Sequence, residues 1–189
     1  MENIDHIPLL IKQLDEYHPS EDPDGPNGER FKELLQLGSR CAFRDHFNPG
    51  HLTGSAWVVD ASWTRVLLLH HGKLNRWLQP GGHADGDLDL ARVALREAKE
   101  ESGLTRLRLV ERCIFDLDIH EIPARGSEPS HLHFDIRYLI EGDIEESLVL
   151  SDESHALEWV ELDRLKDYTT EGSVCRMARK CALRKHRSP

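Results

Sequence analysis

Three glutamates, Glu97, Glu100 and Glu101, lie close together in the segment REAKEESGL, residues 96–104. Successive residues of a helix advance by about 100°, so the three carboxylates would share one helix face. Like charges at this spacing destabilise a helix by about 0.2–0.5 kcal/mol per pair unless a cation compensates them. Charged runs are also common on solvated helix faces. The spacing therefore leaves two interpretations, a divalent-metal site and an exposed face.

The glycine-rich turn WLQPGGHADGD, residues 77–87, favours the metal site. Mg²⁺ and Mn²⁺ prefer oxygen ligands and often bridge protein carboxylates to substrate phosphates. Gly81 and Gly82 let the backbone approach closely, so a main-chain carbonyl could complete a coordination shell beside the glutamates. We therefore predict Mg²⁺ or Mn²⁺ as the cofactor.

Residues 82–104, GHADGDLDLARVALREAKEESGL, resemble the signature of the Nudix hydrolase family, GX5EX7REUXEEXGU, where U is aliphatic and X is any residue. The match is in register from Gly82 onward. One position departs from it, because Leu88 stands where the family has its first Glu, between Asp87 and Asp89. Either aspartate would be a poor substitute, since its side chain is shorter and lies at a shifted helix angle. The departure puts the positioning of the other glutamates in question more than metal binding itself.

The resemblance implies a fold and an activity. The fold is an α/β Nudix fold, a mixed β-sheet sandwiched between helices, and the similarity in strand order extends from about His51 to Leu165. Residues 1–40 would be an N-terminal helical extension and residues 41–189 the Nudix domain. The activity is metal-dependent hydrolysis of a diphosphate linkage in a nucleoside diphosphate joined to another group.

The resemblance also implies roles for individual residues. Glu97, Glu100 and Glu101 would coordinate the metal, with the carbonyl of Gly81 as a further ligand. Glu97 would also orient or deprotonate the attacking water, and Arg96 would brace the glutamates. We expect Glu97, Glu100 and Arg96 to be the catalytic residues.

Family members often supply one more acid from a loop before a late strand. Here SDES, residues 151–154, precedes the apolar run LEWVEL, so we predict Glu153 as an additional metal ligand, with Asp152 as the second choice.

The segment HLHFD places His131, His133 and Asp135 on one face of a predicted strand. Such a row could contact a substrate phosphate or hold a transition metal, or it could consist of hydrogen-bonded surface histidines. We predict substrate contact for all three, and for His83, which follows the double glycine.

Arg44 and Trp77 complete the predicted substrate site. Arg44 precedes the first core strand, together with His51, and could pair with a phosphate, although an exposed arginine needs no such role. Tryptophans are most often core anchors, and Trp77 is the best candidate for stacking on a base because it lies nearest the glycines.

The remaining pattern predicts the other elements. Apolar spacing indicates helices over residues 4–18 and 29–40, and the proline-rich and glycine-rich residues 19–28 break the chain between them. A helix is expected from Asp87 or Leu88 to Ser102, with Gly103 as its C-terminal stop. The expected strands are residues 55–60, 64–71, 106–122, 131–142 and 157–162. Residues 162–186 are expected to be helical, in two pieces.

Composition limits the class of protein. Apolar residues make up 39% and charged residues 31% of the 189, the balance of a soluble globular protein with no apolar run long enough to span a membrane. The net charge of −10 argues against nucleic acid as a partner. The four cysteines are scattered, without a CxxC pair, and the N-terminus lacks a secretion signal, so we expect a cytoplasmic location.

We therefore predict a hydrolase whose partner is a small-molecule diphosphate, and a homodimer formed through residues 1–40. Two other functions stay open. One is removal of diphosphate from RNA 5′ ends, which only the basic C-terminal segment supports. The other is a non-catalytic nucleotide-binding regulatory domain, which the loss of a glutamate at Leu88 favours and the three intact glutamates oppose.

Overall fold

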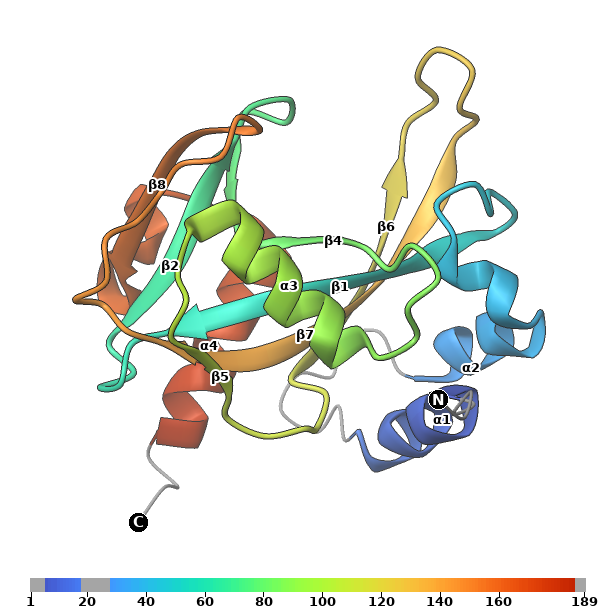
Figure 1. Ribbon diagram of the computed structural model, residues 1–189, viewed down its shortest axis with the longest axis horizontal. Helices are drawn as coiled ribbons and strands as arrows, with labels where there is room; N and C mark the ends of the chain where they lie inside the picture. Colours follow the sequence, from blue (N-terminus) through green and yellow to red (C-terminus); the bar gives the residue numbers. More distant parts are fainter. Residues whose placement is uncertain (1–5, 18–27, 186–189) are drawn as a thin grey trace.

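A computed structural model describes residues 6–17 and 28–185 (Figure 1). Its strands form one sheet with the order β3-β2-β1-β7-β5, in which β4 also pairs with β1, β6 with β7, and β8 with β2. The helical elements are α1 (His6–Glu16), α2 (Glu29–Gln36), η2 (Ser39–Ala42), α3 (Leu90–Ser102), η3 (Leu162–Asp167) and α4 (Gly172–Lys185). The strands are β1 (Gly50–Val59), β2 (Arg65–His71), β3 (Arg76–Leu78), β4 (Gly81–His83), β5 (Leu107–Leu109), β6 (Asp116–Ile122), β7 (His131–Gly142) and β8 (Ser154–Glu161).

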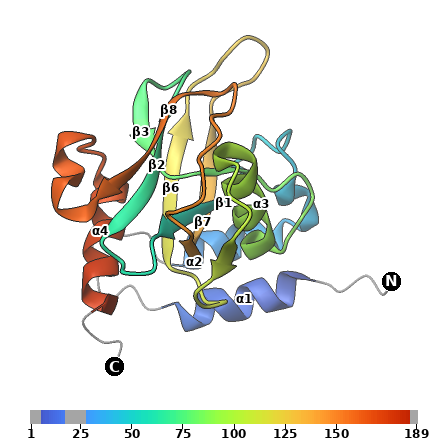
Figure 2. The same cartoon turned by 60° about the vertical axis from the view of Figure 1, so that its left-hand side comes forward.

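The sheet lies between helices, as the sequence predicts. Figure 2 shows α3 and α4 on opposite sides of the strands. Alanines and Val93 of α3 pack with Leu52, Ile136 and Tyr138 in one hydrophobic cluster. A second cluster joins Trp57 of β1 to Val174 and other residues of α4. Each face of the sheet therefore has its own core.

The centre of the sheet is the parallel pair β1 and β7. Their register runs from Gly50 opposite Leu132 to Val59 opposite Glu141, and it places His51 opposite His133. On its other side β1 pairs with β4 through residues 53–55, whereas only Val59 pairs with β2. This pairing brings the start of β7 and the glycines of β4 to the two sides of one strand.

The N-terminal helices pack on the α3 side of the sheet. Leu10, Leu14 and Phe31 belong to the same hydrophobic cluster as α3, and the Phe31 ring contacts Phe134 edge to face at 5.5 Å. The Tyr138 hydroxyl also donates to Gln13 Oε1 at 3.2 Å. The predicted break between the two helices lies mostly outside the described residues.

The structure confirms the predicted alternation of one strand and corrects two other predicted segments. The alternation of β7 is confirmed, because its even-numbered apolar residues pack under α3 and Asp135 and Arg137 face the other way. The single strand expected over residues 106–122 was wrong, since β5 and β6 pair with different parts of β7. The glycine-rich turn of residues 77–87 contains short strands that the sequence did not predict, the end of β3 at Leu78 and the whole of β4.

Within residues 6–17 and 28–185, every helix is too short or too polar to cross a lipid bilayer. The four cysteines, Cys41, Cys113, Cys175 and Cys181, are all unpaired.

Candidate active site

The caps of α3 fix the position of the glutamates. The Asp89 side chain caps the N-terminus by accepting from the Arg92 backbone N–H at 3.3 Å. Gly103 ends the helix in the left-handed conformation, with φ of 74°, which a residue with a Cβ adopts only at a cost. Buried alanines hold the opposite side of the helix against the sheet. Glu97, Glu100 and Glu101 are therefore directed toward the edge of α3 beside β4.

Glu101 is the most constrained of the three glutamates. Its carboxylate accepts from the Gly81 backbone N–H at 2.9 Å. Burial, together with the charges of Glu97 and Glu153, raises the pKa of Glu101 to about 7, against the effect of this hydrogen bond. A divalent cation beside such a carboxyl would stabilise its charged form.

Glu97 lies directly against the second glycine of β4. A Cβ built on Gly82 would lie 2.5 Å from Glu97 Cδ, so only glycine leaves room for the carboxylate. Burial raises the pKa of Glu97, while the neighbouring Arg96 lowers it. The Glu97 carboxylate thus occupies the space beside the Gly82 backbone that a side chain would fill.

Arg96 links the glutamates to the turn. Its guanidinium lies 2.8 Å from Glu97 Oε1 and 3.4 Å from Glu100 Oε2. It also donates to the His83 carbonyl at 3.0 Å. The bracing role predicted for Arg96 is consistent with these contacts. Glu100, whose side chain is 59% exposed, is the glutamate most accessible to an incoming ligand.

These residues fit an oxygen-coordinated divalent cation. Two partly buried carboxyls with raised pKa values, Glu97 and Glu101, lie beside a glycine backbone that approaches them without side chains. Hard cations bind such sets of carboxylate and carbonyl oxygens. The arrangement can hold a divalent cation at the edge of α3 beside β4.

Glu153 lies within electrostatic reach of this group. Its charge contributes to the raised pKa of Glu101. It also opposes the lowering of the His71 pKa by burial. Its backbone carbonyl accepts from the Gly72 N–H at 2.9 Å, which holds the loop before β8 against β2. Neighbouring Asp152 is exposed. The predicted role of Glu153 as a further ligand stays a prediction that this position favours.

Leu88 and its two neighbours serve the fold. Leu88 packs against the hydrophobic cluster under α3. Asp87 forms an ion pair with Arg92 at 2.7 Å. Asp89 caps α3 and also forms an ion pair with Arg112 at 3.0 Å. Neither aspartate is therefore free to act in place of the missing glutamate.

Arg44 reaches the turn from the segment before β1. Its Nε donates to Asp85 Oδ1 at 2.8 Å. This hydrogen bond and the charge of Glu97 raise the pKa of Arg44. The arginine predicted to contact phosphate thus lies beside the glutamates, already paired with a carboxylate. Asp85 itself has φ of 49° and was not predicted from the sequence as a site residue.

Polar residues cover the face of β1 and β7 that is opposite α3. Asp135 is buried and accepts from Thr53 Oγ1 at 3.0 Å, Ser55 Oγ at 2.8 Å and Arg137 Nε at 2.7 Å. Since its oxygens are occupied within the sheet, Asp135 holds the two strands together at the base of this face. Both oxygens of Asp135 already accept hydrogen bonds within the sheet, and this does not support the predicted contact of Asp135 with substrate.

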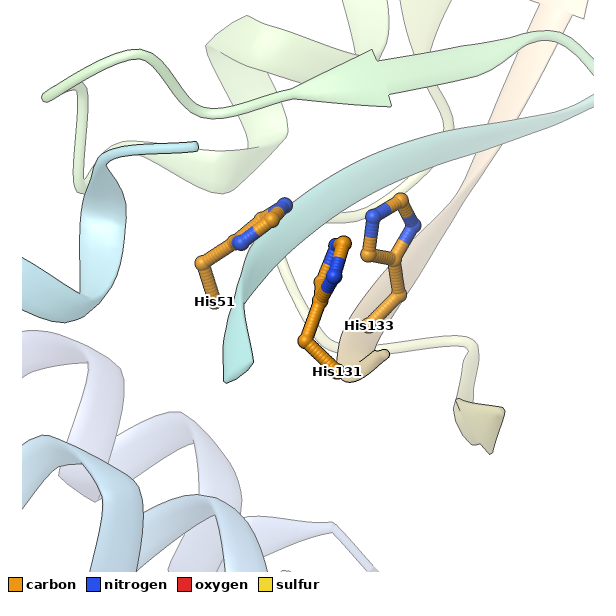
Figure 3. A group of neighbouring side chains, drawn as sticks. All are labelled: His51, His131 and His133. Carbon is orange, nitrogen blue, oxygen red and sulfur yellow. The ribbon is translucent and has the colours of Figure 1, made fainter. Parts of the chain in front are cut away.

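Histidines occupy the same face toward the start of β7. His51, His131 and His133 each offer one ligand nitrogen, and these three atoms lie within 4.8 Å of one another (Figure 3). The ring of His83 lies 5.1 Å from that of His51, and the ring of His120 lies 5.4 Å from that of His133. The structure therefore gathers the predicted histidines with two further ones.

Burial keeps the central histidines neutral. It lowers the pKa of His51 to about 4 and that of His133 to about 2, and the charges of neighbouring histidines act in the same direction. Burial and the nearby Arg44 also lower the pKa of His83. Neutral imidazoles have a lone pair available as a ligand or hydrogen-bond acceptor.

Trp77 lies away from this group. It packs against the second hydrophobic cluster, on the α4 side of the sheet. Its ring contacts Tyr168 edge to face at 5.2 Å and lies 5.2 Å from the ring of His70. The structure therefore does not bring Trp77 together with the glutamates, and it gives the ring a packing role.

Two residues of the histidine group were not assigned from the sequence. His51 was noted only as preceding the first core strand, and His120 was not singled out. Each stands opposite His133 in strand register, His51 across β1–β7 and His120 across β6–β7. A signal existed in the alternation of β6 and in the histidine that opens β1, but only the pairing shows that they meet.

Comparison with known proteins agrees with this description. The family model of the NUDIX domain matches residues 51–176. A probable DHNTP pyrophosphohydrolase of Lactococcus lactis subsp. cremoris is 28% identical over 143 residues, which are 73% of this chain and 81% of the relative.

Solved structures show the same fold. The Ap4A hydrolase of C. elegans, in a binary complex, superposes with a TM-score of 0.58 at 21% identity, covering 72% of this chain and 98% of that one. The dihydroneopterin triphosphate pyrophosphohydrolase of E. coli superposes with a TM-score of 0.51 at 16% identity, covering 70% and 95%.

A mixed sheet between helices, with a glutamate-bearing helix beside a double-glycine turn, is the architecture of a Nudix fold. The extent of the family match settles the assignment, and the chain belongs to the Nudix family.

Proposed function

We propose that this Nudix pyrophosphohydrolase cleaves a phosphoanhydride linkage in a small substrate of the nucleoside diphosphate-X type, using Mg²⁺ or Mn²⁺. The observation that carries the proposal is the contact of Glu97 and Glu101 with the two glycines of β4. Burial raises the pKa of both carboxyls, that of Glu101 to about 7, and a bound divalent cation would stabilise their charged forms.

The residues of the glutamate site have separate roles in the proposed reaction. Glu97, Glu100, Glu101 and the carbonyl of Gly81 would hold the cation, which would supply charge neutralisation and a more acidic bound water. Glu97 orients the attacking water and accepts its proton. Arg96 holds Glu97 and Glu100 in place through its ion pairs and through the His83 carbonyl. A positioned general base contributes about 10²–10⁴-fold in rate.

The relatives suggest which substrate to test first. The Lactococcus relative is named for pyrophosphohydrolysis of DHNTP, and its similarity covers most of both chains. His83 of β4, whose carbonyl accepts from Arg96, borders the glutamate site and offers a contact to a polar substrate. We therefore put a pteridine triphosphate first, followed by dinucleoside polyphosphates.

A non-catalytic nucleotide-binding domain is the second candidate. Its support is the packing of Leu88 in the core, with Asp87 and Asp89 both engaged elsewhere. For RNA 5′ ends as substrate, the described structure adds no observation to the basic C-terminal segment, and the net charge of −10 opposes it.

The test measures release of phosphate or diphosphate from dihydroneopterin triphosphate, dinucleoside polyphosphates, nucleoside triphosphates and sugar nucleotides, with Mg²⁺ or Mn²⁺. Glu97→Gln and Glu100→Gln are compared with Glu33→Gln, which changes an exposed glutamate on α2. We expect turnover that is lost with chelator and in the first two variants and retained in the third. Binding of a nucleotide without turnover of any compound would favour the second candidate, and turnover that persists in Glu97→Gln would contradict the assigned base.

A further inference from the structure

We propose that His51, His131 and His133 form a binding site for one transition-metal ion of the Zn²⁺ class, separate from the glutamate site and independent of the proposed hydrolysis. Figure 3 shows the three rings side by side, His51 from the start of β1 and the other two from the start of β7. Their ligand nitrogens lie within 4.8 Å of one another. Nitrogens on one tetrahedral zinc ion lie about 3.3 Å apart, so modest ring rotations would complete the site.

The hydrogen bonds of two rings leave the correct nitrogen for a metal. His51 Nδ1 contacts the His46 carbonyl at 3.3 Å, and His131 Nδ1 contacts the Pro129 carbonyl at 2.8 Å. A carbonyl only accepts, so each Nδ1 carries the hydrogen and each Nε2 is the free position. Metal-binding histidines commonly donate their other N–H to a carbonyl in this way, which fixes the tautomer and the ring orientation.

The free nitrogen of His51 is buried without a partner. His51 is 1% exposed, and its Nε2 has no hydrogen-bond partner among the described residues. A buried polar atom without a partner destabilises the fold, so such atoms usually mark the position of a water, ion or ligand. The rings of His131 and His133 lie 4.9 Å and 4.7 Å from the His51 ring and 5.4 Å from each other, so the three rings form a triangle.

A phosphate group fits this position less well than a metal. Phosphate oxygens need donors, whereas a neutral His51 or His131 with Nδ1–H on a carbonyl presents only a lone pair at Nε2. Burial disfavours the second proton on His51 that would turn Nε2 into a donor. Three neutral imidazoles are instead a common ligand set for zinc, with a fourth position left for water or another ligand.

Strand geometry preforms the site. His131 and His133 lie two residues apart on β7, so both point to the same face. His51 lies opposite His133 in the parallel register of β1 and β7. Below them Asp135, held by Thr53, Ser55 and Arg137, fixes the spacing of the two strands.

The β4 strand separates this site from the glutamates. Gly82 faces Glu97 on the α3 side, whereas His83 faces His51 on the other side. Oxygen ligands on one side suit Mg²⁺ and imidazoles on the other suit zinc, so the two sites select different ions.

The experiment uses the full chain after removal of metals by chelation, with Co²⁺ and Zn²⁺ as probes and no substrate. With excess Mg²⁺ present to occupy the glutamate site, we expect one equivalent of Co²⁺ to bind with the visible absorption of a four- or five-coordinate ion, and Zn²⁺ to displace it. His131→Gln and His133→Gln should each weaken the Kd for Co²⁺ by more than about 100-fold, beyond the loss that an outer partner causes. The matched controls are His155→Gln, an exposed histidine outside the group, and Glu97→Gln, and both should bind as the wild type does.

Two results would overturn the proposal. One is the absence of a stoichiometric Co²⁺ site in the folded wild type. The other is retention of that site in the two histidine variants, or its loss in Glu97→Gln, which would place the ion at the glutamates. If His131→Gln or His133→Gln fails to fold, zinc-edge X-ray absorption of the wild type decides, because imidazole scattering counts the histidine ligands. Three imidazoles support the site, and a coordination shell of oxygens alone contradicts it.

Discussion

Replacing Gly82 with alanine should separate the position of Glu97 from the stability of the fold. The new Cβ would lie 2.5 Å from Glu97 Cδ and 2.6 Å from each carboxylate oxygen. Ordinary contacts are about 3.5–4.0 Å, so the carboxylate has to move by about 1 Å. A misplacement of that size can cost on the order of 100-fold in rate. Only the end of a flexible side chain moves, so we expect the free energy of unfolding to change by less than about 1 kcal/mol.

The assay compares kcat at saturating Mg²⁺, the Mg²⁺ concentration needed for half-maximal rate, and urea unfolding. Gly172→Ala is the neutral control, because nothing lies within 4 Å of its added Cβ. Gly81→Ala is the opposite control, since its Cβ would meet the Ser55 side chain and lie 3.0 Å from Ser55 Cα. That variant should lose about 1–3 kcal/mol of stability. A folded Gly82→Ala protein with wild-type kcat and Mg²⁺ dependence would refute the role given to Glu97.

Three further predictions concern charge and packing. Asp116, fully buried among three cationic side chains, should cost about 3–5 kcal/mol in urea unfolding when changed to Asn. Burial opposes the charge of Asp118, but a hydrogen bond from His120 and the charge of Arg137 hold its pKa well below the ordinary value. This carboxylate therefore stabilises the fold fully above about pH 4 and less as the pH falls, so Asp118→Asn should flatten the decline of unfolding free energy below about pH 4. Leu88→Glu, which restores the family residue, should lower stability by about 1 kcal/mol, measured by thermal unfolding, because Leu88 is half-buried against the core.

Each of these three has a defined contrary result. Asp167→Asn breaks an exposed ion pair with Arg164 and should cost at most about 1 kcal/mol of unfolding free energy. Equal losses in Asp167→Asn and Asp116→Asn would show that the buried network stabilises the fold no more than an exposed ion pair does. An unchanged acid profile in Asp118→Asn would assign acid unfolding to other groups. A Leu88→Glu protein as stable as the wild type would show that the packing of Leu88 contributes little.

Local signals predicted the elements that carry their own pattern. The helix over the signature has a cap at Asp89, a stop at Gly103 and apolar residues on one side, and all three signals lie within a few residues of the helix. The strand β7 follows strict alternation, so both its existence and the direction of its side chains were predictable. The sharing of one edge by Glu97, Glu100 and Glu101 follows from helix geometry alone.

Pairing between distant segments was not predictable in the same way. The glycines of β4 have no side-chain pattern, and β1 alone makes them a strand. The approach of His51 to His133 depends on a parallel register between segments about 80 residues apart. Trp77 lies near the glycines in sequence, yet it packs toward α4 because β3 pairs with β2. Proximity along the chain misleads where the sheet separates its two faces.

The division of the site by β4 has an evolutionary consequence. The glutamates depend on α3 and its caps, whereas the histidines depend on β1 and β7, and the backbone of the three residues of β4 lies between the two groups. A mutation on the histidine face therefore leaves the packing of α3 and the ion pairs of Arg96 intact. Lineages with this arrangement can diversify what they bind on one side of the strand while the acidic side is inherited unchanged.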